Sequence, residues 1–108
     1  MKPKATIYLA CPYSHDDPEV RAQRLIAAKN AATSLEALGH TVISPVSQLP
    51  NFYMPAEKWE VIERAFIEWV DHFVMIDKDD CWISGGVRAG FNIACEIDKP
   101  ISLVSDWV

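Results

Sequence analysis

The chain has few of the residues that build disulfide-rich, metal-binding or membrane-spanning proteins. Its 108 residues contain three cysteines, Cys11, Cys81 and Cys95, an odd number with no C-x-x-C pair, and three scattered histidines. We therefore expect free thiols in a reducing compartment and no metal or other cofactor. No apolar run approaches the ~20 residues of a membrane span, and the N-terminus lacks the features of a signal peptide. The sequence predicts a cytoplasmic protein without a membrane partner.

Positive charge is also scarce. Lys and Arg number 10 against 15 Asp and Glu, which gives a net charge of −5. An acidic surface repels a phosphate backbone, so we expect no binding to a nucleic-acid polymer. A single nucleotide is still compatible, because a local pocket can be positive on an acidic protein. Half of the residues are hydrophobic, and this length suits a single domain over residues 1–108.

Short apolar runs alternate with amphipathic segments along the chain. The runs predict strands, and the longer segments between them predict helical crossovers of the kind that join parallel strands. We predict an α/β fold: a three-layer, doubly wound parallel sheet of four to five strands, flavodoxin- or Rossmann-like, in the order 2-1-3-4. Strands are expected at 5–10, 40–44, 72–76 and 101–104, helices over 19–38, from 55 to about 70 and over 86–97, and a loop over 45–55.

The segment after Pro55 has a marked helical pattern. Trp59, Ile62, Phe66 and Trp69 form its expected apolar stripe, and we place the glutamates of this segment on its other faces: Glu57, Glu60, Glu63 and Glu68. The aspartates Asp77, Asp79 and Asp80 after the next strand are interpreted as a solvated turn rather than a metal site.

The candidate binding site lies at the carboxyl ends of the strands, where open parallel sheets bind ligands. Ser84-Gly85-Gly86 leads directly into a helix. Its glycines permit close approach of a ligand, and the free N–H groups of the helix start favour an anion. Arg88 adds positive charge. An equally good interpretation is that Ser84 only caps the helix.

Four further residues are candidates. Cys11 and Pro12 end the first strand, where the Cys11 thiol is either reactive or a buried, inert group. Tyr8 lies inside that strand and is either functional or plain core. Asp71 follows a helix end, where the helix dipole disfavours a carboxylate. This unfavourable charge suggests a role, with a solvated surface Asp as the alternative.

Four segments together resemble the nucleoside 2-deoxyribosyltransferase-like proteins. Residues 7–12 read IYLACP, close to the IYLAGP strand that opens those proteins, and residues 39–45 (GHTVISP) resemble their second strand. Residues 71–76 match their "aDavv" strand entry. Residues 86–101 match, without gaps, the pattern G-x-x-x-E-x-G-x-A-x-x-x-G-K-P-V. The resemblance covers nearly the whole chain, and the W-x-S-G-G loop at 82–86 is similar to that of small, uncharacterised members.

This resemblance implies an activity. In the family a glutamate of the last helix attacks the anomeric carbon of a deoxyribose, and a base or water resolves the ester. By the same likeness, Tyr8 orients the nucleophile, Asp71 assists at the base, and Ser84 holds a 5′-phosphate. The ligand-binding set is then Cys11, Pro12, Ser84, Gly85, Gly86 and Arg88. The family also implies a homo-oligomer, for which we expect a homodimer with the apolar Trp107-Val108 end as a possible contact.

The departure from the family pattern that bears most directly on activity is at the nucleophile position. The nucleophile position is Gly90, which can neither attack carbon nor transfer a proton. Glu96 lies about 240° further around the helix and cannot simply replace it. Three hypotheses follow: an N-glycosidase or deoxyribosyltransferase that acts on a 2′-deoxynucleoside or its 5′-phosphate, with an acid from elsewhere; a non-catalytic nucleotide-binding or sensing module; or a local loss that Gly90→Glu would repair.

Overall fold

Four parallel strands form the centre of the computed structural model, which describes residues 3–12, 15–48, 55–77 and 85–108. The described strands pair in the order β2-β1-β3-β4, and all three pairings are parallel. The predicted fold class and strand order are confirmed. The elements are β1 (Thr6–Ala10), α1 (Pro18–Ala37), β2 (Thr41–Ile43), α2 (Pro45–Gln48), α3 (Ala56–Trp69), β3 (His72–Met75), α4 (Gly85–Glu96), β4 (Ile101–Leu103) and the 3₁₀ turn η2 (Val104–Asp106).

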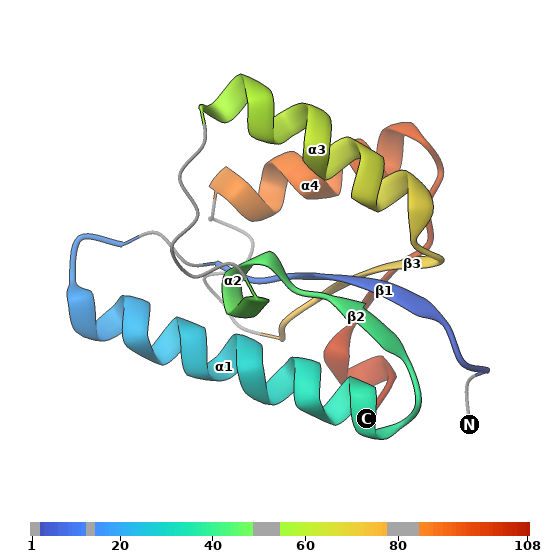
Figure 1. Ribbon diagram of the computed structural model, residues 1–108, viewed down its shortest axis with the longest axis horizontal. Coiled ribbons are helices and arrows are strands. Elements are labelled where there is room, and N and C mark those ends of the chain that lie inside the picture. Colours follow the sequence, from blue (N-terminus) through green and yellow to red (C-terminus); the bar gives the residue numbers. More distant parts are fainter. Residues whose placement is uncertain (1–2, 13–14, 49–54, 78–84) are drawn as a thin grey trace.

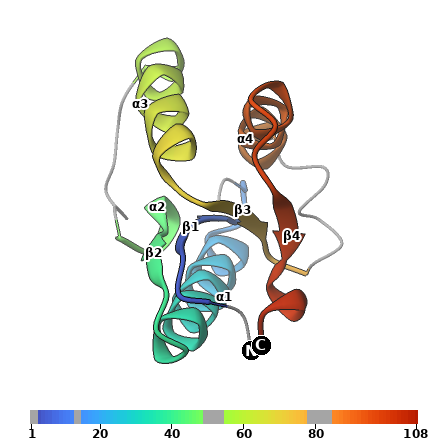
Figure 2. The same ribbon diagram turned by 90° about the vertical axis from the view of Figure 1, so that its right-hand side faces the viewer.

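The sheet lies between two helical layers. Figure 1 shows α1 on one face and α3 with α4 on the other, and Figure 2 shows the same three layers end-on. Alternate residues of the central strands serve alternate faces, as the period of a strand requires. In β1, Ile7 and Leu9 pack toward α1, whereas Tyr8 and Ala10 join the cluster beneath α3 and α4.

Local sequence signals start and stop α1 where they were expected. The Asp17 carboxylate caps the helix by accepting a hydrogen bond from the Glu19 N–H at 2.9 Å, and Pro18 occupies the first helical position. Gly39 follows the helix with a φ of +95°, a conformation that glycine adopts without strain. Among the described helices, none is both long and apolar enough to cross a membrane.

Two short elements were not expected. The loop predicted from 45 to 55 begins with a helical turn, α2, because Gln48 folds back on the end of β2. Its side chain accepts from the Ser44 N–H at 3.0 Å and donates to the Val42 carbonyl at 2.9 Å. The last expected strand is one residue shorter, since Val104 opens η2 instead.

The predicted apolar stripe of α3 was wrong at one end. Trp69 is 61% exposed, whereas Glu63, which we had placed on a polar face, is only 5% exposed. At about 100° per residue, Glu63 lies about 40° from Trp59 around the helix and Trp69 lies about 80° away on the other side. The side of α3 that faces the sheet therefore includes Glu63, together with Ile67 and Val70.

The end of α4 requires a left-handed residue, and an aspartate supplies it. Asp98 has a φ of +56°, and the Lys99 N–H bonds the Ala94 carbonyl at 2.8 Å across the turn. This pattern usually has glycine at the left-handed position, because a Cβ there is strained.

We predict that Asp98→Gly stabilises the protein by about 1 kcal/mol, because it removes that strain and a negative charge from a helix C-terminus. For a chain of this size the melting temperature should rise by roughly 4–8 °C. Asp98→Ala is the matched control: it removes the charge but keeps a Cβ. An equal gain in the Asp98→Ala variant would show that the backbone conformation is not the cause.

Candidate active site

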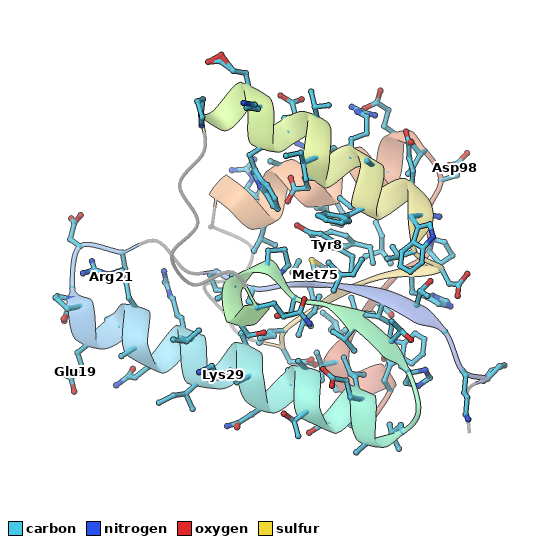
Figure 3. All side chains as sticks on the ribbon, in the orientation of Figure 1. Tyr8, Glu19, Arg21, Lys29, Met75 and Asp98 are labelled. Atoms are coloured by element: carbon cyan, nitrogen blue, oxygen red, sulfur yellow. The ribbon has the colours of Figure 1, made fainter. Side chains whose placement is uncertain are left out.

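A tyrosine and a glutamate from distant parts of the chain meet in the core between the sheet and its α3/α4 layer. The Tyr8 hydroxyl donates a hydrogen bond to Glu63 Oε2, with 2.6 Å between the oxygens. Both residues are buried, at 4% and 5% exposure. Figure 3 shows Tyr8 in this layer, above Met75 of the sheet. The bond has the length typical of a hydroxyl that donates to a carboxylate.

Strand register places the other members of the site. β1 and β3 pair so that Tyr8 and Phe73 are neighbours, and their rings stack with centroids 5.6 Å apart. Helices α3 and α4 pack on each other above these rings. Glu63 of α3 and Gly90 of α4 consequently face the same space over Phe73.

Burial determines the protonation of the pair. It raises the pKa of the Tyr8 phenol, and the Glu63 carboxylate adds to this effect, so the phenol remains protonated and acts as the donor. Burial also raises the pKa of Glu63, reinforced by the nearby charge of Glu60, and hydrogen bonds from Tyr8 and Trp59 only partly offset this. Among the described residues, no Lys or Arg forms an ion pair with Glu63.

Gly90 leaves room that its neighbours partly fill. A Cβ built on Gly90 would lie 3.1 Å from Phe73 Cε2 and 3.5 Å from Glu63 Oε2. The first distance is tighter than ordinary van der Waals contact, so any side chain at position 90 would displace the Phe73 ring. The carboxylate of Glu63 thus lies within van der Waals contact of the place that a Cβ at position 90 would occupy.

The predicted ligand-binding residues lie in different parts of the structure. Cys11 is buried on the α1 face of the sheet, opposite to the Tyr8 phenol, and its thiol contacts the Leu9 carbonyl at 3.9 Å. Pro12 is buried beside it. Gly85 and Gly86 open α4, and Arg88 is exposed in its first turn. Ser84 lies outside the described residues.

Asp71 is not brought to the Tyr8–Glu63 pair. It lies at the opposite, amino-terminal edge of the sheet, where its carboxylate accepts from the Thr6 N–H at 2.9 Å. Its own N–H donates to the Thr6 side-chain oxygen and carbonyl at 2.8 and 2.9 Å. Hydrogen bonds from the Thr6 N–H and the Thr6 side chain lower the pKa of the Asp71 carboxyl group, and all contacts between the two residues join the starts of β1 and β3. These contacts give Asp71 a structural role at the amino-terminal edge of the sheet, and its assistance at the base stays a prediction.

Two other expectations concern metals and the C-terminus. Within the described ranges, no three His, Cys, Asp or Glu side chains gather as a metal site would require. Asp79 and Asp80 lie outside those ranges, and Asp77 instead accepts a hydrogen bond from the Ser105 N–H at 2.9 Å.

Trp107 packs edge-on against His40 and His72 within the chain. The homodimer stays a prediction.

Sequence reasoning missed Glu63, although a signal for it was present. Its position one turn after Trp59 and one turn before Ile67 places it within an apolar helix face. A charged residue at such a position predicts a buried carboxylate with a specific partner. The partner, Tyr8, is 55 residues away in sequence, and no local pattern indicates it.

A four-stranded parallel sheet in this order, covered by helices on both faces, is a single-domain α/β fold of the kind found in 2-deoxyribosyltransferases. A model of one protein family, a domain of unknown function termed DUF1937, matches residues 5–106. The chain therefore belongs to this family.

A solved structure agrees with this class. The chain is similar to a 2-deoxyribosyltransferase from the psychrotolerant bacterium Bacillus psychrosaccharolyticus, described as a biocatalyst for the synthesis of antiviral and antitumoral nucleosides. The two share 29% sequence identity with a TM-score of 0.63, over 92% of this chain and 71% of the other. No curated protein matches the sequence.

We predict that Glu63→Gln removes one contribution to the pH dependence of stability. The raised pKa means that folded protein binds this proton more tightly than unfolded protein does. Wild type therefore loses stability as pH rises above the ordinary Glu value, by up to about 1.4 kcal/mol per pH unit until the folded pKa is passed. The variant lacks this loss and should be relatively more stable at pH 8 than at pH 4.

Urea unfolding across this pH range measures the effect. Glu68→Gln, which changes an exposed glutamate near the other end of the same helix, is the control and should follow wild type. Parallel pH profiles for wild type and Glu63→Gln would contradict the prediction.

We also predict that Gly90→Glu destabilises the protein by at least about 2 kcal/mol, because it crowds Phe73 and buries a second carboxyl group beside Glu63. In a Glu63→Ala background the same change should cost less, since space and charge are released. Denaturant unfolding of the two single variants and the double variant gives the coupling. Equal costs in both backgrounds would show that the two positions do not share this space.

Proposed function

We propose that this protein binds a 2′-deoxynucleoside or its 5′-phosphate, and that it either cleaves the N-glycosidic bond or transfers the deoxyribosyl group to another base. The observation that carries the proposal is the buried Tyr8–Glu63 pair beside Gly90. It belongs to a chain with 29% identity to a 2-deoxyribosyltransferase over 92% of its length. The likeness supports nucleoside chemistry, and the pair supplies functional groups suited to it.

The chemistry of the pair fits the reaction. Cleavage of a glycosidic bond develops positive charge at the anomeric carbon, which a neighbouring carboxylate stabilises or captures. A phenol that donates to the carboxylate holds it in one orientation. Carboxyl groups with raised pKa values in buried positions are common at catalytic sites.

The amino end of α4 supports the phosphate part of the proposal. Gly85 and Gly86 open this helix, and Arg88 is exposed in its first turn. Free N–H groups, the helix dipole and a guanidinium all favour an anion. With Ser84 proposed as a further phosphate ligand, a 5′-monophosphate should bind more tightly than its nucleoside.

A second candidate is a non-catalytic binding or sensing module. Gly90 favours it, since the residue that the family uses as nucleophile is absent. The two candidates share a ligand and differ in its fate: an enzyme releases or exchanges the base, whereas a binding module leaves the ligand intact.

Thermal-shift and base-release assays test both candidates with one panel of ligands. Each common 2′-deoxynucleoside and its 5′-monophosphate is added to purified protein, and free base is followed by chromatography, with ribonucleotides as the matched control. We expect a rise in melting temperature with the deoxynucleotides, larger for the monophosphates, and release of base from at least one of them. Binding without release would select the second candidate. Neither a shift nor release across the panel would refute both.

A further inference from the structure

The carboxylate of Glu63 lies next to the place that a Cβ of position 90 would occupy. We propose that Glu63, supplied by α3 instead of α4, is the nucleophile of this protein, and that Tyr8 is its positioning residue. The inference rests on the proposed function and deepens it, since it names the group that reacts.

Interatomic distances support a nucleophile on α3 instead of α4. Glu63 Oε2 is 3.5 Å from the Cβ position that Gly90 leaves empty and 2.6 Å from the Tyr8 oxygen. The absence of a side chain at Gly90 thus makes room for a carboxylate from the adjacent helix.

The surroundings of Glu63 are unusual for a purely structural residue. Buried glutamates normally pair with a cation, because burial disfavours the charge. No described Lys or Arg forms an ion pair with Glu63; its hydrogen-bond donors are Tyr8 and Trp59. A leucine or methionine at this position would complete the apolar cluster without that cost. The presence of a carboxylate at this position is explained by use of its reactivity.

The proposed reaction has two balanced steps. In the first, an oxygen of ionised Glu63 forms a bond to the anomeric carbon while the bond to the base nitrogen breaks. The electron pair goes to the base, which takes a proton from water. In the second, water or another base attacks the anomeric carbon, the ester bond to Glu63 breaks, and the attacking group returns a proton to solvent. The carboxylate is restored.

Wild-type protein alone gives the first test. Protein quenched in acid during turnover of the most active deoxynucleoside or deoxynucleotide is digested and examined by mass spectrometry. We expect a deoxyribosyl adduct on the peptide that contains Glu63. An adduct on another residue would overturn the proposal, and this measurement does not depend on whether a variant folds.

Two variants give the second test. Glu63→Gln keeps the shape and a hydrogen-bond acceptor for Tyr8, and should lower the rate of base release at least about a thousandfold while ligand still raises the melting temperature. Glu63→Ala with added azide should form the glycosyl azide, a product that a structural role would not give. Glu68→Gln should turn over like wild type.

The outcomes separate this inference from the proposed function. Wild-type turnover in Glu63→Gln would refute the role of Glu63 and leave an N-glycosidic enzyme with another nucleophile. Wild-type binding without any base release would refute it while the binding function stands. Absence of both binding and release would refute the proposed function itself.

Discussion

The hydrogen bond between Tyr8 and Glu63 determines how the layer formed by α3 and α4 is arranged over the sheet. A carboxylate without a cation is costly to bury, and the cost is tolerated only where donors of fixed geometry meet it. The phenol is such a donor, because burial keeps it protonated. Its direction is set by β1, whose alternate side chains point to α3 and α4. The bond therefore couples the pose of α3 to the central strand.

The same bond explains why two other positions, Phe73 and Gly90, belong with this pair. Phe73 stacks on Tyr8 from the neighbouring strand and occupies part of the space beside Gly90. Glu63 occupies the adjoining part. The Phe73 ring, the Glu63 side chain and Gly90 therefore depend on one another in size, because the side chains of a close-packed core share its volume without overlap. Phe73 and Glu63 fill the space next to Gly90, so the glycine is part of the packing of this core as well as a departure from the family pattern.

The opposite edge of the sheet is held by a separate set of bonds. Asp71 joins the starts of β1 and β3 through Thr6. Lys99 donates to the Glu68 and Val70 carbonyls at 3.1 and 2.6 Å, which satisfies the end of α3. Register is fixed here, at the amino edge, away from the Tyr8–Glu63 pair. This separation allows the site to hold a costly buried group while the sheet keeps its alignment.

The sequence alone determined the fold class and the boundaries of α1, because each depends on period, turn chemistry or capping within a few residues. The strand order 2-1-3-4, which local period cannot fix, was the arrangement we favoured, and the tertiary structure decided it. The sequence also placed Tyr8 and Gly90 at positions of interest, through ordered motifs along the chain. Only the tertiary structure decided that Glu63 is inside, that Asp71 serves the far edge, and that Cys11 faces α1. These outcomes depend on which helix packs over which strand. Contacts between Tyr8 and Glu63, 55 residues apart, arise from packing rather than from local pattern.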